Sequence, residues 1–237
     1  MELKGGLAHR ITVVLPTYNE RETLPLTVEK LSALLGRNVR FIVVDDNSPD
    51  GTAGVAIKLS EKYPIKLILR EKREGLGAAL MQAYKEVETD LILSIDTDMQ
   101  FSLDNIKTMF ERIDEGCDIV VASRYVRGGS VHRIPILRIL ASRTANALAR
   151  TICRVPISDF TANFRLFKRD VLARFSCTRK SNFYLAEFLV KAHRSGLKIC
   201  EVPVEFHGRE KGRSKLRLFE ESLLFVKELI TLSLTGL

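Results

Sequence analysis

The strongest constraint on the fold is a pattern repeated along the first half of the chain. Each repeat is a short apolar run followed by polar residues and then by a segment with helical spacing. The apolar runs are residues 11–15 (ITVVL), 41–44 (FIVV), 65–69 (IKLIL), 91–95 (LILSI) and 118–122 (DIVVA). Most are continuous rather than alternating, as in strands buried on both faces of a parallel sheet. Helical spacing follows at residues 23–35, 53–62, 75–86 and 104–115. Units of roughly 25–30 residues in this order predict an α/β protein with an open, mostly parallel sheet flanked by helices.

The pattern changes after residue 122. Residues 133–154 and 216–234 have amphipathic helical spacing, and arginines decorate the first of these segments. Residues 164–167 and 200–206 are predicted short strands, with a helix at 184–195 between them. No low-complexity linker divides the 237 residues, so we expect a single domain over residues 1–237.

Charge is distributed unevenly along the chain. Residues 1–122 hold 15 Lys and Arg against 20 Asp and Glu, whereas residues 123–237 hold 22 against 9. A basic second half could be a solvated surface, or it could face nucleic acid, anionic lipid or a phosphorylated substrate. The chain has no Trp and only 7% aromatic residues, and no strand has the aromatic pattern of an RNA-binding sheet. We therefore expect no nucleic-acid partner.

The cysteines and the chain ends suggest a cytoplasmic protein. The four cysteines stand far apart without a CxxC pair, which argues against a zinc ribbon or a disulfide framework and predicts reduced thiols. Polar residues and Pro16 interrupt the apolar residues near the N-terminus, so no secretory signal is expected. The best candidate for a membrane span, residues 222–237, contains Lys227 and Glu228.

Three polar segments stand directly after predicted buried strands, at residues 17–20, 45–47 and 96–100. In open α/β sheets, ligands bind beyond the carboxyl ends of the strands. In the third segment, Asp96 and Asp98 are two residues apart and should project to the same side. Two carboxylates facing one crevice repel each other, and a divalent cation such as Mg²⁺ or Mn²⁺, bound together with substrate phosphates, would relieve that repulsion. The alternative is a solvated acidic turn.

Other motifs point less clearly to chemistry. Residues 45–51 (DDNSPDG) have good turn composition, but a turn does not require adjacent aspartates, and an acidic residue after the second strand can accept from a ribose or a base. Gly75-Leu76-Gly77 lacks the third glycine of a dinucleotide fingerprint and is interpreted as a turn and helix start. The four histidines show no metal-ligand spacing. Several basic residues beside predicted turns could clamp phosphate or merely solubilise the surface: Arg124, Arg127, Arg138, Arg209, Lys211, Arg213 and Lys215.

Seven motifs in order resemble one family. LPTYNE (15–20), VVDDNSPDGT (43–52), DTDMQ (96–100) and SRYVRGG (123–129) resemble the family 2 glycosyltransferases of the GT-A fold. SDFTANFRLFKRDVL (158–172), EVPVEF (201–206) and REKGRSKL (209–216) narrow the resemblance to polyprenyl-phosphate mannosyltransferases of the dolichol-phosphate mannose synthase type. The match runs from residue 11 to about residue 234.

The resemblance implies a site for each substrate. Residues 9–122 would bind the nucleotide sugar, residues 123–215 the acceptor, and residues 216–237 would form a C-terminal amphipathic helix. The metal would be held by Asp96, Asp98 and Gln100. The GDP-mannose contacts would be Pro16, Tyr18, Glu20, Val44, Asp46, Asp96, Thr97, Asp98, Gln100, Arg209 and Lys215. The acceptor phosphate would meet Arg124, Arg138 and Ser142, and the catalytic residues would be Asp98, Arg124 and Arg209.

The implied activity is metal-dependent, inverting transfer of mannose from GDP-mannose to dolichyl or another polyprenyl phosphate. The two amphipathic helices would lie at a membrane surface on the cytosolic side, or else pack on the sheet or form a dimer face. The chain departs from the family at Asn163, where relatives often have Gly, and no segment of the sequence is predicted to be one of the transmembrane helices that many relatives carry. Relatives without such helices use interfacial helices or a membrane-anchoring subunit.

Two alternatives remain open. The chain could use UDP-glucose or another nucleotide sugar as the donor to a polyprenyl phosphate. It could also be a non-catalytic nucleotide-binding or membrane-anchoring subunit of a larger complex.

Overall fold

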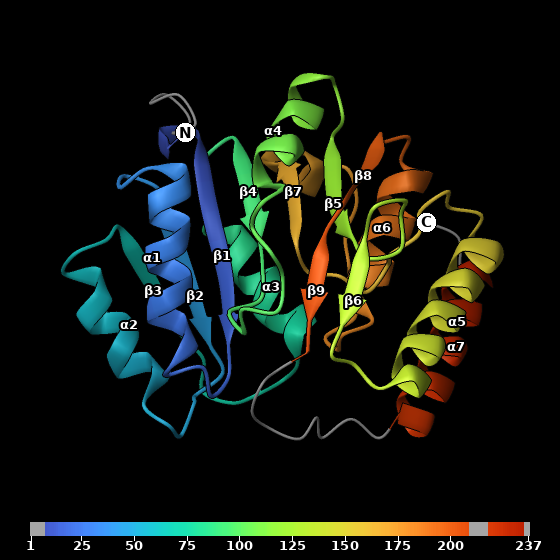
Figure 1. Cartoon of the computed structure of the whole chain (residues 1–237), viewed down its shortest axis with the longest axis horizontal. Coiled ribbons are helices and arrows are strands. Elements are labelled where there is room, and N and C mark those ends of the chain that lie inside the picture. The colour runs from blue at the N-terminus through green and yellow to red at the C-terminus, as the bar shows by residue number, and fades with distance from the viewer. Residues whose placement is uncertain (1–7, 209–217, 235–237) are drawn as a thin grey trace.

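A seven-stranded sheet forms the centre of the molecule. The computed structural model describes residues 8–208 and 218–234 (Figure 1). The sheet contains β1 (Ile11–Thr17), β2 (Arg40–Asp45), β3 (Ile65–Leu69), β4 (Leu91–Ser94), β5 (Ile119–Ser123), β7 (Arg165–Lys168) and β8 (Ile199–Pro203). Their order is β3-β2-β1-β4-β7-β5-β8, and only β7 runs antiparallel to its neighbours among these strands. The expected open, mostly parallel sheet is confirmed, and it includes strands from both halves of the chain.

The central strands are buried on both faces, as their continuous apolar runs predict. Ile11, Val13 and Leu15 of β1 are fully buried, while β3 lies at the sheet edge and is partly exposed. The sheet is flanked by α1 (Thr23–Leu35), α2 (Thr52–Ser60), α3 (Leu76–Lys85), α4 (Ile106–Asp114) and α6 (Tyr184–Arg194). Figure 1 shows α1 in front of the sheet and α3 behind it. Short 3-10 helices occupy Ala8–Arg10 and Arg169–Ala173.

The Gly75-Leu76-Gly77 segment begins α3, as interpreted from the sequence. A Cβ atom on Gly77 would lie 2.2 Å from the carbonyl oxygen of Arg179 and 2.6 Å from Cβ of Tyr184. The glycine therefore permits the start of α3 to approach the start of α6 closely, which is a packing role.

A small parallel ribbon of β6 (Ser130–His132) and β9 (Glu205–His207) stands beside the main sheet. The sequence predicted one strand over residues 200–206, but the structure divides it into β8 and β9, and β6 was not predicted. Three-residue strands contain too few positions to show a period, so their pairing depends on distant partners. Phe206 of β9 also bridges to Phe101 in the segment after β4.

The two amphipathic helices, α5 (Ile136–Cys153) and α7 (Leu218–Leu234), pack against each other at one side of the molecule (Figure 1). The prediction that the first helix begins at residue 133 is wrong, because Arg133 has φ +56° and Pro135 precedes the first helical turn. Several of their large apolar side chains are exposed: Ile136, Leu137, Leu140, Leu148, Leu224, Ile230 and Leu234. No helix in the described part of the chain has the length and apolarity to cross a membrane.

The expectation of reduced thiols is wrong for one pair of cysteines. Cys117, just before β5, and Cys200 in β8 form a disulfide across 83 residues of sequence, with Cα atoms 6.1 Å apart. Because β5 and β8 are parallel neighbours whose register pairs Val120 with Cys200, the fold brings these distant residues together. Sequence spacing could not indicate the pairing, since it depends on strand order. Cys153 and Cys177 are free.

Candidate active site

The three polar segments predicted from the sequence lie together at one end of the sheet. The register of β1 pairs Pro16 with Val44 and Thr17 with Asp45, and the N–H of Asp46 donates to the carbonyl of Thr17. On the other side of β1, the N–H of Ile95 donates to Val14, and the hydroxyl of Thr97 lies 3.5 Å from the carbonyl oxygen of Pro16. The strand ends are thus tied directly to one another, and Asp96–Gln100 emerges beside the segment after β1.

The two adjacent aspartates after β2 have different roles. Asp45 is fully buried, and its carboxylate accepts hydrogen bonds from the hydroxyl of Thr17 at 2.9 Å and from the N–H and hydroxyl of Ser48 at 2.8 and 2.6 Å. Asp45 therefore holds the turn. Ser48 in turn accepts from the N–H of Asn19 at 3.0 Å, which joins the first polar segment to the second.

Asp46 points into a cluster of charged side chains. Its carboxylate forms an ion pair with Arg70, and both side chains are almost fully buried. Burial raises the pKa of Asp46, and the neighbouring Arg70 and Arg73 guanidinium groups only partly offset that rise. Arg73 lies over the exposed Tyr18 ring, 4.2 Å from its centroid. Two of the expected nucleotide contacts, Tyr18 and Asp46, are therefore each covered by an arginine from the segment after β3.

The other expected nucleotide contacts differ in accessibility. Pro16 and Glu20 are half-buried, and Glu20 accepts from the hydroxyl of Thr23 at 2.5 Å. Val44 is fully buried, so its side chain cannot touch a nucleotide and only its backbone is available. Arg209 and Lys215, together with the loop around them, lie outside the described residues.

The expected metal ligands lie together after β4. Asp96, Asp98 and Gln100 are all half-buried. Oδ1 of Asp98 accepts from the N–H of Gln100 at 3.2 Å, and Nε2 of Gln100 donates to the carbonyl of His207 at 3.0 Å. That bond uses the amide nitrogen and not the oxygen that would bind a cation. In the described part of the chain, no three His, Cys, Asp and Glu side chains gather as a metal site. Two carboxylates and an amide oxygen are nevertheless a donor set that suits Mg²⁺ or Mn²⁺ when substrate phosphates complete the shell.

Asn163, the position at which the chain departs from its relatives, contacts this site. Its side chain is buried, its Nδ2 donates to Oδ1 of Asp96 at 2.9 Å, and its Oδ1 accepts from the hydroxyl of Ser94 at 2.9 Å. Ser94 ends β4 and Asn163 lies two residues before β7. Because β4 and β7 are antiparallel neighbours, the end of one strand meets the start of the other.

Left-handed backbone conformations mark the same three segments. Asn19, Asn47 and Met99 have φ values of +62°, +56° and +58°, and each lies in one of the polar segments that follow β1, β2 and β4. Such conformations are uncommon for residues other than glycine and concentrate at functional sites. Among the described residues, two other non-glycine residues, Arg133 and Arg154, also have positive φ, and they lie before and after α5.

Arg124, expected to meet a phosphate, is already engaged. Its Nε and Nη2 donate to the two carboxylate oxygens of Asp159 at 2.7 and 2.8 Å, and Nη2 also reaches the hydroxyl of Thr161 at 2.6 Å. Asp159 is fully buried and only 12% of the Arg124 side chain is exposed. Asp159 raises the pKa of Arg124 despite the opposing effect of burial. Arg124 could contact a phosphate only through Nη1, which has no hydrogen-bond partner among the described residues.

The other two expected acceptor residues lie on α5. The hydroxyl of Tyr125 donates to that of Ser142 at 2.7 Å, which links Ser142 to the segment that carries Arg124. The guanidinium of Arg143 lies 5.6 Å from the Tyr125 ring centroid. Arg138 lies one turn before Ser142 on the same helix and is half-buried. The structure thus brings Ser142 next to the Arg124 segment.

Arg165 is a buried cation that sequence reasoning did not single out. Its guanidinium donates to the carbonyl oxygens of Ala162, Leu185 and Phe160 at 2.8, 2.8 and 2.9 Å. Burial lowers its pKa to about 10. Arg165 fixes the backbone on which Asp159, Thr161 and Asn163 are mounted, so it supports the site without being part of it.

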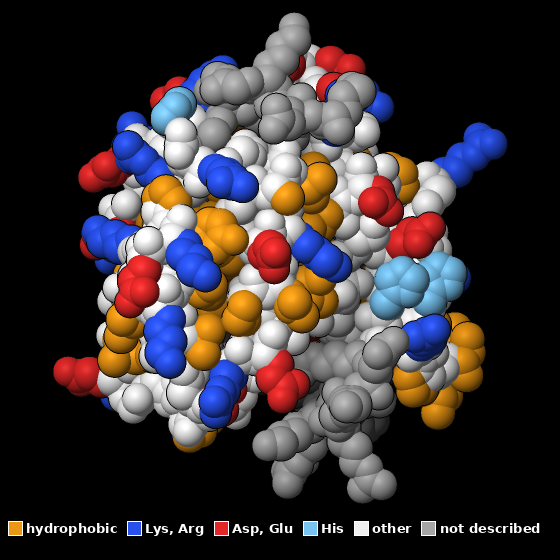
Figure 2. All heavy atoms as spheres, turned by 60° about the vertical axis from the view of Figure 1, so that its left-hand side comes forward, with side chains coloured by type: hydrophobic (Ala, Val, Ile, Leu, Met, Phe, Trp, Pro, Cys, Tyr) orange, Lys and Arg blue, Asp and Glu red, His pale blue; other side chains and the backbone are white. Residues whose placement is uncertain are grey.

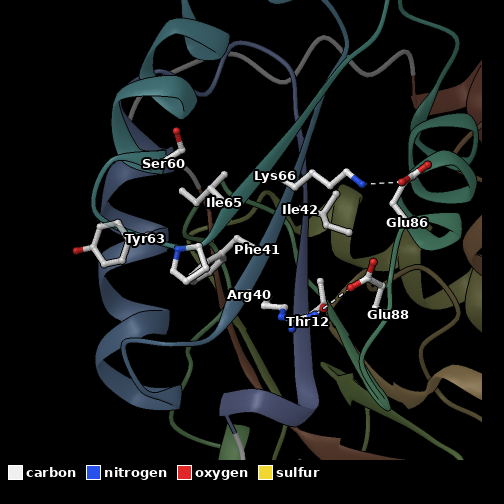
Figure 3. A pocket seen from close by; sticks show the side chains of 11 residues that line it. Thr12, Arg40, Phe41, Ile42, Ser60, Tyr63, Ile65, Lys66, Glu86 and Glu88 are labelled. Carbon is white, nitrogen blue, oxygen red and sulfur yellow. Dashed lines mark hydrogen bonds and ion pairs between the residues drawn. The ribbon is translucent and has the colours of Figure 1, made fainter.

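A groove of about 350 Å³ lies at the opposite end of the sheet (Figure 3). It is lined by the first residues of β2 and β3, and by the ion pairs Lys66–Glu86 at 2.7 Å and Arg40–Glu88 at 3.2 Å. The groove lies at the amino ends of the strands, so it is separate from the polar site.

On the side of the molecule shown in Figure 2, exposed apolar side chains stand among charged side chains of both signs.

Comparison with known proteins identifies the family. Residues 12–175 match the model of glycosyl transferase family 2. A curated relative from Pyrococcus furiosus, named dolichol-phosphate mannosyltransferase, is 37% identical over 211 residues, covering 88% of this chain and 59% of the relative. Another from Mycolicibacterium smegmatis, named polyprenol monophosphomannose synthase, is 34% identical over 87% of this chain and 81% of the relative. The chain therefore spans about three fifths of the length of the first of these relatives.

Solved structures show the same fold. Glucosyl-3-phosphoglycerate synthase from Mycobacterium tuberculosis, solved with Mn²⁺, uridine diphosphate and glucosyl-3-phosphoglycerate, superposes with a TM-score of 0.69 and is 21% identical. The likeness covers 96% of this chain and 80% of that one. It confirms the GT-A fold expected from the sequence.

Proposed function

Because the chain belongs to glycosyl transferase family 2 and is therefore a glycosyltransferase, we propose that it transfers mannose from GDP-mannose to dolichyl or another polyprenyl phosphate. The observation that carries the proposal is the convergence of three polar segments, ending with Asp96 and Asp98, at the carboxyl end of one sheet. The names of the two curated relatives favour this acceptor and this sugar. We also propose that the whole chain acts as one catalytic domain.

The donor would lie across the ends of β1, β2 and β4. A buried carboxylate is a strong acceptor for N–H donors, and guanine offers adjacent N–H groups on one edge where uracil offers only one. Asp46, beside Arg70, is our proposed contact to that edge, and we propose that a base stacks on Tyr18, whose ring lies under Arg73. Of the two, Asp46 favours GDP over UDP as the nucleotide, whereas stacking on Tyr18 would suit either base.

Asp96, Asp98 and Gln100 would hold a divalent cation, Mg²⁺ or Mn²⁺. When bound, the cation would supply Lewis-acid stabilisation of the negative charge that develops on the departing diphosphate. Thr97 is nearly fully buried between the two aspartates, and its carbonyl accepts from the hydroxyl of Thr27 at 3.2 Å. That bond anchors the segment between the two carboxylates to α1.

The acceptor would need no general base. A phosphate monoester has a second pKa of about 6, so at neutral pH it is mostly a dianion and can attack the anomeric carbon directly. A hydroxyl acceptor would instead need a positioned carboxylate to take its proton. The protein's task is to bring two anions together, for which Arg124, Arg138 and Ser142 are our proposed contacts. Attack opposite the leaving group inverts the anomeric centre and gives a β-linked mannosyl phosphate.

We propose that the α5–α7 pair rests on the membrane surface that holds the acceptor, on its cytosolic side. Ile136, Leu137 and Leu140 at the start of α5 are 52–73% exposed, and Arg138 and Arg143 stand among them. Apolar side chains flanked by arginines suit the interface of an anionic bilayer. Sedimentation with vesicles tests this: the chain should pellet with anionic vesicles more than with neutral ones. Equal recovery in the supernatant from both would contradict it. A membrane-anchoring subunit could assist this contact.

The transfer itself can be measured directly. Incubation with labelled GDP-mannose, Mn²⁺ and a polyprenyl phosphate should move label into the organic phase as a product that mild acid releases. UDP-glucose in place of GDP-mannose should give little product. Transfer from UDP-glucose alone would change the donor assignment, and the absence of transfer from either donor to the lipid phosphate would contradict the proposed function.

A further inference from the structure

We propose that Asn163 is a positioning residue that fixes the Asp96 carboxylate for cation binding, an inference that rests on the proposed function. Asn163 is 1% exposed, and its amide is used at both ends. Nδ2 donates to Oδ1 of Asp96 and Oδ1 accepts from the hydroxyl of Ser94, both at 2.9 Å. The two bonds also define the orientation of the amide, because a hydroxyl that donates to one end leaves the nitrogen to donate to the carboxylate.

The chain of bonds reaches into the core. Ser94 is fully buried at the end of β4, where the antiparallel register pairs it with Arg165 of β7. The Asp96 carboxylate, at the rim of the site, is thus connected through Asn163 and Ser94 to rigid elements behind it.

This connection has a chemical consequence for a cation site. A carboxylate that rotates freely must lose that freedom when it binds a cation, and the loss weakens binding. A buried donor that holds one carboxylate oxygen removes part of that cost in advance. Removing such an outer partner typically weakens metal affinity by about 10- to 100-fold. Asn163 therefore belongs to the cation site although it donates no ligand to it.

The matched control is Asn146, another buried asparagine. It is 3% exposed, donates to the carbonyl of Ser142 at 2.8 Å and accepts from the N–H of Phe160 at 2.6 Å. Replacing either asparagine by alanine removes a buried amide with two hydrogen bonds. Of these two asparagines, only Asn163 contacts an expected cation ligand. Comparing the two alanine variants therefore separates the loss of a positioning contact from a general loss of packing.

The test is the Mn²⁺ concentration that gives half-maximal GDP binding, measured by calorimetry on the full chain. For Asn163→Ala this concentration should rise by about 10- to 100-fold, and GDP affinity should recover at saturating Mn²⁺. For Asn146→Ala it should stay at the wild-type value. Ser94→Ala keeps the bond from Asn163 to Asp96 but releases the other end of the amide, so we expect a smaller rise in the Mn²⁺ concentration for half-maximal GDP binding. This variant provides the test if Asn163→Ala folds poorly.

The outcomes separate this inference from the proposed function. If wild-type GDP binding depends on Mn²⁺ and Asn163→Ala and Ser94→Ala show the same dependence as the wild type, Asn163 does not position Asp96. If wild-type GDP binding does not depend on Mn²⁺, the cation site itself is wrong. An equal rise in Asn163→Ala and Asn146→Ala would also overturn the inference, because it would indicate a general effect of lost packing.

Discussion

Replacing Asp98 by asparagine should lower the rate of mannose transfer by roughly 10²- to 10³-fold while the chain stays folded. Asp98 is half-buried after β4, and its Oδ1 accepts from the N–H of Gln100 at 3.2 Å. The asparagine keeps the shape and one oxygen but loses the negative charge that a divalent cation requires. Without that charge, the negative charge on the departing diphosphate is poorly stabilised.

The measurement is the initial transfer rate at several Mn²⁺ concentrations, together with the thermal midpoint of each protein. Asp104→Asn is the matched control: Asp104 lies six residues further along the same segment, is exposed, and accepts from the hydroxyl of Ser102 at 2.6 Å. We expect this control to remain close to the wild-type rate. Retention of more than about a tenth of the wild-type rate by Asp98→Asn would contradict the assignment of Asp98.

Breaking the buried pair of Arg124 and Asp159 should destabilise the protein strongly. In Asp159→Asn, the amide nitrogen would face the Arg124 guanidinium and leave a buried charge without a counter-ion. Such changes cost about 3–5 kcal/mol, which for a chain of this size lowers the thermal midpoint by roughly 6–20 °C. Chemical denaturation checks the free energy of unfolding directly.

Two further variants make the second prediction specific. Glu88→Gln breaks the ion pair of Arg40 and Glu88, whose side chains are 53% and 82% exposed, and should leave the midpoint nearly unchanged because solvent screens such pairs. The double variant Arg124→Met with Asp159→Leu should be more stable than Asp159→Asn, since it removes both charges. A midpoint for Asp159→Asn within 2 °C of the wild type would contradict the prediction.

The same pair sets a pH dependence. Burial alone would raise the pKa of Asp159. The Arg124 guanidinium and the N–H groups of Arg124 and Thr161 outweigh this effect of burial, so the pKa of Asp159 lies below its ordinary value of 3.8. The native state therefore binds this proton more weakly than the unfolded state does. The stabilisation is complete above the unfolded pKa and is lost as pH falls from 3.8 through the folded pKa.

The sequence predicted the parts of the fold that depend on local patterns. The helix at Thr23–Leu35 and the strand at Ile65–Leu69 match the predicted bounds, because their apolar spacing ends at clear Gly and polar signals. The positions of the three polar segments followed from the rule that parallel strands end at the same edge. What could not be predicted depends on pairs far apart in sequence.

The hydrogen bonds that Asn163 forms with Ser94 and Asp96 are examples of such long-range pairs. The partners Ser94 and Asp96 are 69 and 67 positions away from Asn163 and become neighbours only because β7 inserts between β4 and β5. The disulfide of Cys117 and Cys200 depends in the same way on the pairing of β5 with β8. Arg124 was recognised as a functional candidate, but its bidentate bond to Asp159 joins residues that lie 35 positions apart in sequence. A long-range pairing leaves no periodic signal in the sequence.

The most direct test of the account is the affinity of the wild-type chain for GDP, measured by calorimetry with Mn²⁺ and again after chelation with EDTA. We expect tight binding with Mn²⁺ and a loss of at least about tenfold in affinity when the ion is removed, because Asp96 and Asp98 repel the diphosphate unless a cation lies between them. An affinity for GDP that is the same with and without the ion would contradict the central claim that these carboxylates hold a cation for the nucleotide sugar.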